Sequence, residues 1–278
     1  MNYKIVVSKH AFFDLSEIKQ YISLDNPTLA KAYVERILSK IEILKEFPLC
    51  GKAIKNSIMN YTACHYLLAV NHIVIYQINE LAKCIYIVRV LSHYQDWKNI
   101  LQKDIIDRLS PIIKNERITL SKMDENMIFD IWKNSLDEDN RKYVPDEVFE
   151  SLEETNDVVD QIIKNYEEKD GPFVYAIIRN EDRANLGYVQ LVKIDNGWEI
   201  GYHIAKRYTN NGYATESLKL FIQYIKVNFK LKEIYGIALA ANKASVRVLE
   251  KCGFELFFKG PGMYQGKKRN IVKTFKKL

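Results

Sequence analysis

The sequence has few of the residues that build disulfide frameworks and metal centres. It contains four cysteines, no two of which form a C-x-x-C pair, and five scattered histidines. Disulfide scaffolds and zinc sites normally bring several such residues together at short spacings. We therefore expect no metal site, buried thiols and a reducing compartment, which makes the cytoplasm the expected location.

Long apolar runs are also missing. No run reaches the roughly 20 residues that a membrane-spanning helix needs, and the first 13 residues are too polar for a signal peptide. We expect no membrane partner. With 278 residues and 47% hydrophobic content, the chain is long enough for two globular domains. Its net charge of +6 suits a partner that carries phosphates, but it equally suits proteins that bind no nucleic acid.

The most informative stretch covers residues 198–217, which read WEIGYHIAKRYTNNGYATES. Alternating apolar residues predict a strand over Trp198–Ala205, and helical spacing begins at Ala214. The turn between them can direct backbone N–H groups toward one point at a helix N-terminus, where the helix dipole also favours an anion. Gly212 has no Cβ, so a phosphate can approach the backbone closely. A plain structural turn would look similar, and the downstream sequence favours the pyrophosphate-binding loop.

A second motif, AANKASVRVLEKCGF at residues 240–254, follows at the distance of one helix and one strand. Together the two motifs resemble the GNAT family of acetyl-CoA-dependent N-acetyltransferases, in particular the branch of the ribosomal-protein acetyltransferases. That family carries a Gln/Arg-x-x-Gly-x-Gly/Ala loop and an N-x-x-S-x-x-x-x-E-K-x-G-F helix. Thr209 stands where Gln or Arg is usual, which leaves the backbone cradle intact but questions a side-chain contact to the phosphate.

The resemblance implies acetyl-CoA as co-substrate and indicates which residues hold it. Backbone groups of Ile204 and Ala205 would bind the pantetheine arm, and Asn242 and Ser245 would lie beside the thiol end. The pyrophosphate would lie on the loop. Its expected contacts are Asn210, Asn211, Gly212, Tyr213, Ala214 and Thr215.

Acetyl transfer to an amine needs a held thioester, a polarised carbonyl and a base that deprotonates the ammonium group. Glu199 is the candidate base, and a rim carboxylate paired with a lysine is the alternative interpretation. Many family members carry a proton-donating Tyr seven residues after the helix Asn, where this sequence has Leu249. Tyr264 or water would substitute, or no dedicated acid exists. The acceptor is a primary amine on a protein N-terminus, a small molecule or an aminoacyl-tRNA.

The first hundred residues predict a separate α+β unit. A strand near Tyr3–Ser8 precedes two helices, which Ser8 and Asn26 cap, and the second helix has Pro27 in its first turn. A short connection between the helices predicts an antiparallel hairpin. Three strand-like runs follow, near residues 63–69, 72–79 and 83–91.

This arrangement resembles the RelE/ParE superfamily of bacterial toxins, through the runs AFFDLSEIKQYI, DNPTLA, FPLCGK, HIVIYQI and IVRVLSHYQDW. Members that cut messenger RNA on the ribosome use cations and proton-moving groups. The resemblance then indicates Arg89, His93 and Tyr94, with Lys52 and Lys55 on the preceding loop. A purely structural interpretation makes Arg89 a solvated strand residue and His93 a strand-end hydrogen-bonder. The ParE branch, which acts on DNA gyrase without that ribonuclease cluster, fits about as well. The implied partners are an antitoxin for residues 1–98 and the ribosome, tRNA or gyrase.

We therefore expect three segments. Residues 1–98 form the toxin-like domain, 99–114 a connector that breaks at Ser110-Pro111, and 115–278 the mixed-sheet α/β GNAT domain, in which an acidic helix over 145–168 borders the acceptor site. One hypothesis is an N-acetyltransferase fused to a type II toxin-antitoxin-like toxin domain. The alternative is a toxin with an accessory acetyltransferase half. The intact loop and helix favour the first, and a fusion without functional coupling stays open.

Overall fold

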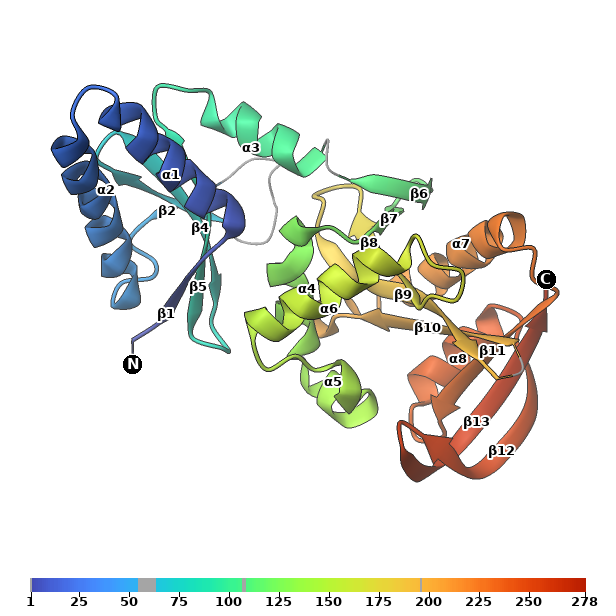
Figure 1. Ribbon diagram of the computed structural model, residues 1–278. Helices are drawn as coiled ribbons and strands as arrows, with labels where there is room; N and C mark the ends of the chain where they lie inside the picture. Colours follow the sequence, from blue (N-terminus) through green and yellow to red (C-terminus); the bar gives the residue numbers. More distant parts are fainter. Residues whose placement is uncertain (1, 55–63, 107–108, 196) are drawn as a thin grey trace. The chain divides into compact units, whose positions relative to one another are not determined.

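The computed structural model describes residues 2–54, 64–106, 109–195 and 197–278 (Figure 1). The chain divides into two compact units, Met1–Asp107 and Arg108–Leu278. The first contains a five-stranded sheet and the second an eight-stranded sheet. In the described parts of the chain, no helix is long and apolar enough to cross a membrane.

The first unit is a helix hairpin on a mostly antiparallel sheet. In chain order its elements are β1 (Lys4–Val7), α1 (Lys9–Ser23), α2 (Pro27–Glu42), the 3₁₀ turn η1 (Ile43–Lys45), β2 (Lys52–Ala53), β3 (His65–Ala69), β4 (His72–Asn79), β5 (Cys84–Ser92) and α3 (Trp97–Ile106). The strand order is β1-β5-β4-β3-β2, and β1 pairs with β5 in parallel. Ser8 and Asn26 accept hydrogen bonds from backbone N–H groups at the starts of α1 and α2, so both predicted caps are confirmed.

The two faces of this sheet bury different helices. Leu15 of α1 and Ile41 of α2 pack on one face, whereas Leu101 of α3 packs with Ile75 on the other. Helix α3 is therefore held to the first unit by apolar contacts. This differs from the expectation that residues 99–114 form a connector between the domains.

The second unit is built on a mixed sheet. Its elements are β6 (Ser110–Lys114), β7 (Ile118–Lys122), η2 (Glu125–Met127), α4 (Ile128–Ser135), α5 (Glu138–Tyr143), η3 (Pro145–Glu147), α6 (Leu152–Asn165), β8 (Phe173–Arg179), β9 (Asn185–Ile194), β10 (Gly197–Ile204), η4 (Lys206–Tyr208), α7 (Tyr213–Asn228), β11 (Glu233–Leu239), α8 (Lys243–Lys251), β12 (Glu255–Tyr264) and β13 (Lys267–Lys277). The strand order is β12-β13-β11-β10-β9-β8-β7-β6. Strands β10 and β11 are parallel, and the other neighbours are antiparallel.

Helices cover both faces of the second sheet. Val174 and Ile178 of β8 pack with Ile162 of α6 on one face, and Tyr175 and Ile177 join the core beneath α7 on the other. Successive side chains of a strand point to opposite faces, so α6 and α7 lie on opposite sides of the sheet. Figure 1 shows α4 and α6 side by side over the strands, in agreement with their mutual contacts.

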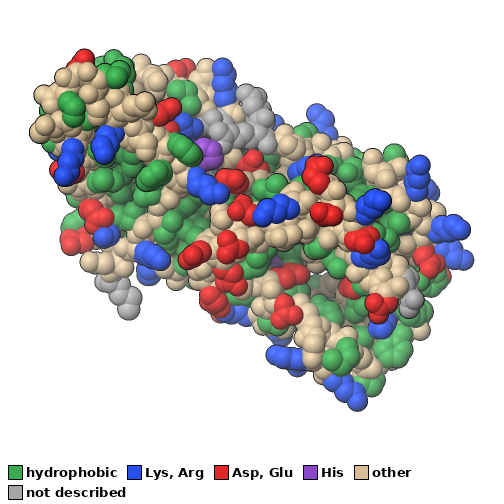
Figure 2. All heavy atoms as spheres, viewed as in Figure 1, with side chains coloured by type: hydrophobic (Ala, Val, Ile, Leu, Met, Phe, Trp, Pro, Cys, Tyr) green, Lys and Arg blue, Asp and Glu red, His purple; other side chains and the backbone are tan. Residues whose placement is uncertain are grey.

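The acidic helix is shorter than the expected 145–168. Ser151 caps α6, which begins at Leu152, and the residues before it form the η3 turn. Glu153 and Glu154 are exposed in the first turn of α6. Acidic side chains gather over this end of the helix in Figure 2. The acids of α6 thus form a solvated face, while the preceding turn carries Glu147 toward the sheet.

Candidate active site

The site lies where the parallel strands β10 and β11 separate. Along their described lengths the two strands are in register only at Glu199 and Tyr235, although β10 stays in register with β9 throughout. Beyond Glu199 the edge of β10 that faces β11 therefore has no registered neighbour. A cavity of about 310 Å³ opens at this point.

Side chains from several elements converge on this first cavity. Glu199 and Tyr202 of β10, Asn242 and Ser245 at the start of α8, and Tyr264 of β12 line it. The Tyr202 hydroxyl donates to the Ser245 carbonyl at 2.8 Å and lies 2.9 Å from Ser245 Oγ. Asn242 Oδ1 accepts from the Ser245 N–H at 3.1 Å and caps α8. The structure thus brings the predicted base together with two of the predicted cofactor residues.

Burial changes the acid–base properties of the cavity. It raises the pKa of the partly buried Glu199 to about 7, although the charge of Lys273 opposes the shift. A carboxyl group with a pKa near neutrality is well suited to accept a proton. Burial also raises the pKa of Tyr264 to about 12, and the nearby carboxylates add to this. Tyr264 therefore keeps its proton at neutral pH in the cavity that also contains Leu249, the residue at the family's tyrosine position.

The buried Glu199 carboxyl leads to a prediction about stability. Its pKa rises from 4.5 to about 7 on folding, so the folded state loses stability as the pH rises from about 4.5 to about 7. Glu199→Gln cannot ionise, and we expect it to raise the melting temperature of the second unit more at pH 8 than at pH 5. Calorimetry measures this, with the exposed Glu168→Gln as control. If Glu199→Gln changes the melting temperature by the same amount at both pH values, the raised pKa of Glu199 is contradicted.

The loop between β10 and α7 forms an open helix N-terminus. Gly212 precedes α7 with a φ of +83°, and no side chain caps the helix. A Cβ on Gly212 would meet nothing within 4 Å, so the space in front of the loop is free. The first-turn N–H groups of a helix lack intrahelical partners and attract anions. The remaining predicted contacts lie in this loop or the first turn of α7: Asn210, Asn211, Tyr213, Ala214 and Thr215.

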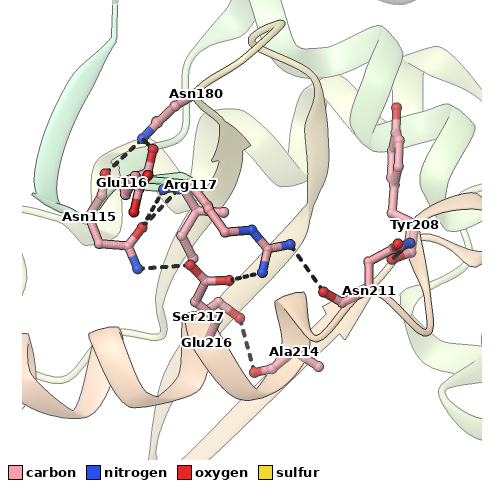
Figure 3. A network of polar contacts seen from close by, with 10 residues as sticks. Asn115, Glu116, Arg117, Asn180, Tyr208, Asn211, Ala214, Glu216 and Ser217 are labelled. Atoms are coloured by element: carbon pink, nitrogen blue, oxygen red, sulfur yellow. Dashed lines mark hydrogen bonds and ion pairs between the residues drawn. The ribbon is translucent and has the colours of Figure 1, made fainter.

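A polar network holds this loop from behind (Figure 3). Arg117 Nη2 donates to the Asn211 carbonyl at 3.1 Å, and Arg117 Nη1 lies 3.0 Å from Glu216 Oε2. Asn115 Nδ2 donates to Glu216 Oε1 at 3.0 Å. The Arg117 guanidinium also lies over the Tyr213 ring, 4.5 Å from its centroid. The loop is therefore pre-organised by its links to the β6–β7 turn, which reduces the ordering cost of binding.

Side chains in the loop also close its own turns. The Thr209 hydroxyl donates to the Lys206 carbonyl at 2.8 Å. Asn211 Nδ2 donates to the carbonyls of Tyr208 and Thr209, at 3.2 and 2.9 Å. At the position where the family pattern usually has Gln or Arg, the Thr209 side chain therefore stabilises the turn by a hydrogen bond to its backbone. An anion in front of this loop would therefore be held by backbone N–H groups and not by the Thr209 side chain.

The two predicted pantetheine contacts differ in their backbone orientation. The Ala205 N–H donates to the Leu186 carbonyl at 2.8 Å, and the Ala205 carbonyl accepts from the Tyr208 N–H at 2.8 Å. Alternate residues of an antiparallel strand bond to the same neighbour. Ile204 and Tyr202 therefore turn their backbone groups toward β11. Ile204 has the predicted orientation, whereas both backbone groups of Ala205 already have partners.

Sequence reasoning missed the polar residues on the opposite wall of the cavity. Glu147 of η3 and Gln190 of β9 line it, and Gln190 Nε2 donates to Glu147 Oε1 at 3.3 Å. Burial raises the pKa of Glu147 to about 7. Gln190 lies between Tyr188 and Val192 on the same face of β9, so a polar residue in that row was the available signal. Nothing in the sequence connects it to Glu147.

Comparison with known families identifies both units. The family model of the acetyltransferase (GNAT) domain matches residues 117–255, half of the chain. The chain belongs to the GNAT acetyltransferase family. The family model of the ParE toxin of the type II toxin-antitoxin system parDE matches residues 5–97. The resemblances to GNAT enzymes and to RelE/ParE toxins are thereby confirmed.

Individual relatives of the GNAT unit agree. The uncharacterized N-acetyltransferase YoaA of Bacillus subtilis is 28% identical over 151 residues, covering 52% of this chain and 83% of the relative. A GNAT-family acetyltransferase structure from Bacillus anthracis has a TM-score of 0.52 and 24% identity, over 59% of this chain and 97% of that chain. The structure of RimL, a ribosomal L7/L12 α-N-protein acetyltransferase in complex with coenzyme A, has a TM-score of 0.52 and 18% identity. The match covers 62% of this chain and 98% of that chain. The predicted acetyltransferase fold is confirmed.

In the ParE-like unit, Arg89 is tied to helix α1. Its Nε donates to Asp14 Oδ2 at 2.8 Å and its Nη2 to Asp14 Oδ1 at 2.9 Å. The Val90 N–H also donates to Asp14 Oδ2, at 2.8 Å. The two side chains are only 16% and 9% exposed. Both sides of the Arg89 guanidinium fork that these bonds use are thus directed at the Asp14 carboxylate.

The other toxin-domain candidates lie beyond the end of β5. His93 Nδ1 is 2.9 Å from the Asn71 carbonyl oxygen, and the His93 and Tyr94 rings lie 3.7 Å apart between centroids. Tyr94 is 79% exposed. Lys52 is exposed on β2, and Lys55 lies outside the described residues. The structure thus brings His93 and Tyr94 together, while Arg89 pairs with Asp14.

We expect Arg89→Ala to destabilise the ParE-like unit by about 3–5 kcal/mol, because it leaves the buried Asp14 carboxylate without its partner. Arg36 on α2 is exposed, and Arg36→Ala is the control, with an expected change within about 0.5 kcal/mol. Urea unfolding followed by circular dichroism measures both. If the two variants lose the same stability, the Arg89–Asp14 pair has no structural role.

Proposed function

We propose that the GNAT unit transfers the acetyl group of acetyl-CoA to a primary amine, with Glu199 as the base. The observation that carries the proposal is the cavity at the separation of β10 and β11, which contains Glu199 and lies on the strand that leads into the open loop at Gly212. Family membership supports acetyl transfer, and RimL, which has the same fold, is in complex with coenzyme A.

Acetyl-CoA fits the site in an extended form. Its pyrophosphate would lie against the N–H groups of the loop and the first turn of α7, in front of Gly212. Its pantetheine arm would follow the edge of β10 at Ile204 and Tyr202, where the register with β11 has ended. The thioester would then reach the cavity beside Ser245. We propose the cytoplasm, where acetyl-CoA is available, as the location. Three of the cysteines are buried thiols as predicted, whereas Cys50 is exposed.

The residues in the cavity support a direct transfer. The Glu199 carboxylate takes a proton from the acceptor's ammonium group, and the freed amine nitrogen attacks the thioester carbonyl carbon. The new C–N bond forms as the C–S bond breaks, and the nitrogen releases its second proton to water, from which Tyr264 recovers the proton that it donates to the leaving thiolate. The coenzyme A thiolate takes up a proton from Tyr264, which we assign as the donor because it lines the same cavity in protonated form.

The test is the transfer of labelled acetyl groups from acetyl-CoA to a panel of amines. The panel contains ribosomal-protein N-terminal peptides, small amines and aminoacyl-tRNA, because each is a candidate acceptor. We expect a labelled amide with at least one class and none with Gly212→Asp. Binding of acetyl-CoA without transfer to any amine would contradict the proposed function.

For the ParE-like unit we favour a toxin activity directed at gyrase over cleavage of messenger RNA. The ion pair of Arg89 with Asp14 supports this choice, as does the match to the ParE model. An antitoxin is the proposed partner of this unit. Expression of the full chain with Gly212→Asp, which removes acetyl transfer, should arrest growth and trigger DNA damage signalling with intact transcripts. Transcripts cut in a ribosome-dependent manner would contradict it.

The two units should also fold independently. Each has its own hydrophobic core, and the division at residues 107 and 108 suggests fragments 1–107 and 108–278 in place of 1–98 and 115–278. Circular dichroism of the isolated fragments tests this boundary. An unfolded fragment would contradict it.

A further inference from the structure

A second cavity of about 250 Å³ lies between α6 and the strands β8 to β10 of the GNAT unit. The surface that lines it is mainly apolar and includes Ile131, Phe149, Val158 and Ile162, and polar side chains such as Asn134, Asn140 and Asn185 also line it. A dry apolar cavity of about 150 Å³ is large enough to bind benzene. The second cavity therefore has room for an aromatic or branched aliphatic group.

The second cavity adjoins the first. Glu147, Tyr188 and Gln190 line both of them. Tyr188 and Gln190 are two residues apart on β9, so their side chains lie on the same face of the sheet. A molecule that occupies the second cavity would thus meet Glu147 and Gln190 at the boundary with the first cavity, which contains Glu199.

One oxygen of the Glu147 carboxylate is held by a hydrogen bond at this boundary, and the other lacks a partner among the described residues. Its Oε1 accepts from Gln190 Nε2 at 3.3 Å, whereas its buried Oε2 has no hydrogen-bond partner among the described residues. Gly201 makes room for Gln190, since a Cβ there would lie 2.7 Å from Gln190 Nε2. A buried carboxylate oxygen without a partner is costly. A donor from a bound molecule would remove that cost.

The charges that line the second cavity indicate which kind of hydrogen-bond donor a bound molecule would offer to Glu147. The ionisable residues that line the second cavity are Asp146, Glu147, Tyr188 and His203, and none of its described lining residues is Lys or Arg. Burial lowers the pKa of His203 to about 4, so His203 is neutral at pH 7. An ammonium group is therefore attracted, and an acidic substituent would be repelled.

We propose that the acceptor is a primary amine with an uncharged apolar substituent beside it, which fills the second cavity while the ammonium group binds Glu147. This inference rests on the acetyl transfer proposed above. Glu147 is then a binding residue that holds the ammonium group next to Glu199. Glu199 takes the proton, and the nitrogen forms the C–N bond as the C–S bond of the thioester breaks.

Amino-acid amides test the substrate class directly. We expect kcat/KM for leucinamide and phenylalaninamide to exceed that for glycinamide and for the α-amide of aspartic acid by about tenfold or more, because each methylene in an apolar pocket contributes roughly 10–200-fold. Transfer to all four amides with equal kcat/KM, or a preference for glycinamide, would overturn the inference while leaving the proposed function intact. No transfer to any of the four amides would overturn this inference, whereas the proposed function fails only if no amine of the wider panel is acetylated.

Two variants separate the role of Glu147 in binding the ammonium group from the role of the second cavity in binding the apolar substituent. Glu147→Gln should raise KM for every amide by about tenfold or more, with little change in kcat. Val158→Phe should lower kcat/KM for phenylalaninamide by about tenfold or more and leave glycinamide unaffected. The rise in melting temperature with acetyl-CoA, unchanged in both variants, verifies folding. An unaltered KM in Glu147→Gln, or an equal loss for both amides in Val158→Phe, would overturn the inference.

Discussion

Gly212→Asp should abolish the binding of acetyl-CoA. The substitution brings a carboxylate to the point where we propose that the loop N–H groups bind the pyrophosphate, so two anions would compete for one site. In wild type, acetyl-CoA at about 100 times its Kd should stabilise the native GNAT unit by about 2.7 kcal/mol. We expect the corresponding rise in melting temperature to disappear in Gly212→Asp.

Gly212→Asn is the matched control for this experiment. Gly212 has a φ of +83°, and Asn tolerates this left-handed conformation better than most residues. A Cβ there meets no atom within 4 Å, so Asn and Asp differ mainly in charge. Gly212→Asn should keep most of the rise in melting temperature. If both variants lose the rise in melting temperature equally, the effect comes from the loop backbone and not from the charge. If Gly212→Asp keeps the full rise in melting temperature, the loop is not the pyrophosphate site.

The local parts of this fold could be predicted from the sequence. The caps at Ser8, Asn26 and Asn242 involve acceptors and N–H groups only three residues apart, so short-range chemistry determines them. The open loop at Gly212 is equally local. The residues that we propose for the cofactor site lie in such segments, so their local geometry could be predicted from the sequence.

Contacts between distant residues were beyond prediction. Asp14 pairs with Arg89 across 75 residues, and neither side chain has a pattern that identifies the other. The same holds for Glu147 and Gln190, which are 43 residues apart. Only the packing of η3 on the sheet brings these two together, and the second cavity depends on that packing.

Prolines stand in both edge strands of the GNAT sheet, and one of them misled the prediction. Ser110-Pro111 predicts a break, but Pro111 stands in β6, an edge strand with an irregular register. Pro261 likewise stands in β12, the opposite edge, where it pairs in register with Asn270. An edge strand tolerates proline because one side of its backbone needs no partner. Sequence alone does not tell which strands will form the edges.

Glu199→Gln should lower kcat/KM by about 10²–10⁴-fold at pH 7, the contribution typical of a general base. Burial raises the pKa of Glu199 to about 7, so the wild-type rate should rise with pH until Glu199 is ionised and then level off. Glu147 has a similarly raised pKa and would steepen the same limb. In Glu199→Gln the remaining rate should depend on the fraction of acceptor that is already deprotonated, and it should keep rising above pH 7.

The pH profile of kcat/KM separates this role from a structural one. Lys273 lowers the pKa of Glu199, so Lys273→Met should shift the wild-type limb to higher pH without abolishing activity. Glu255 is exposed on β12, and Glu255→Gln should retain the wild-type profile. The rise in melting temperature with acetyl-CoA should be preserved in all three variants, because none of the substituted residues belongs to the pyrophosphate loop. A full wild-type rate and profile in Glu199→Gln would exclude Glu199 as the base and leave the proton to Glu147 or to water.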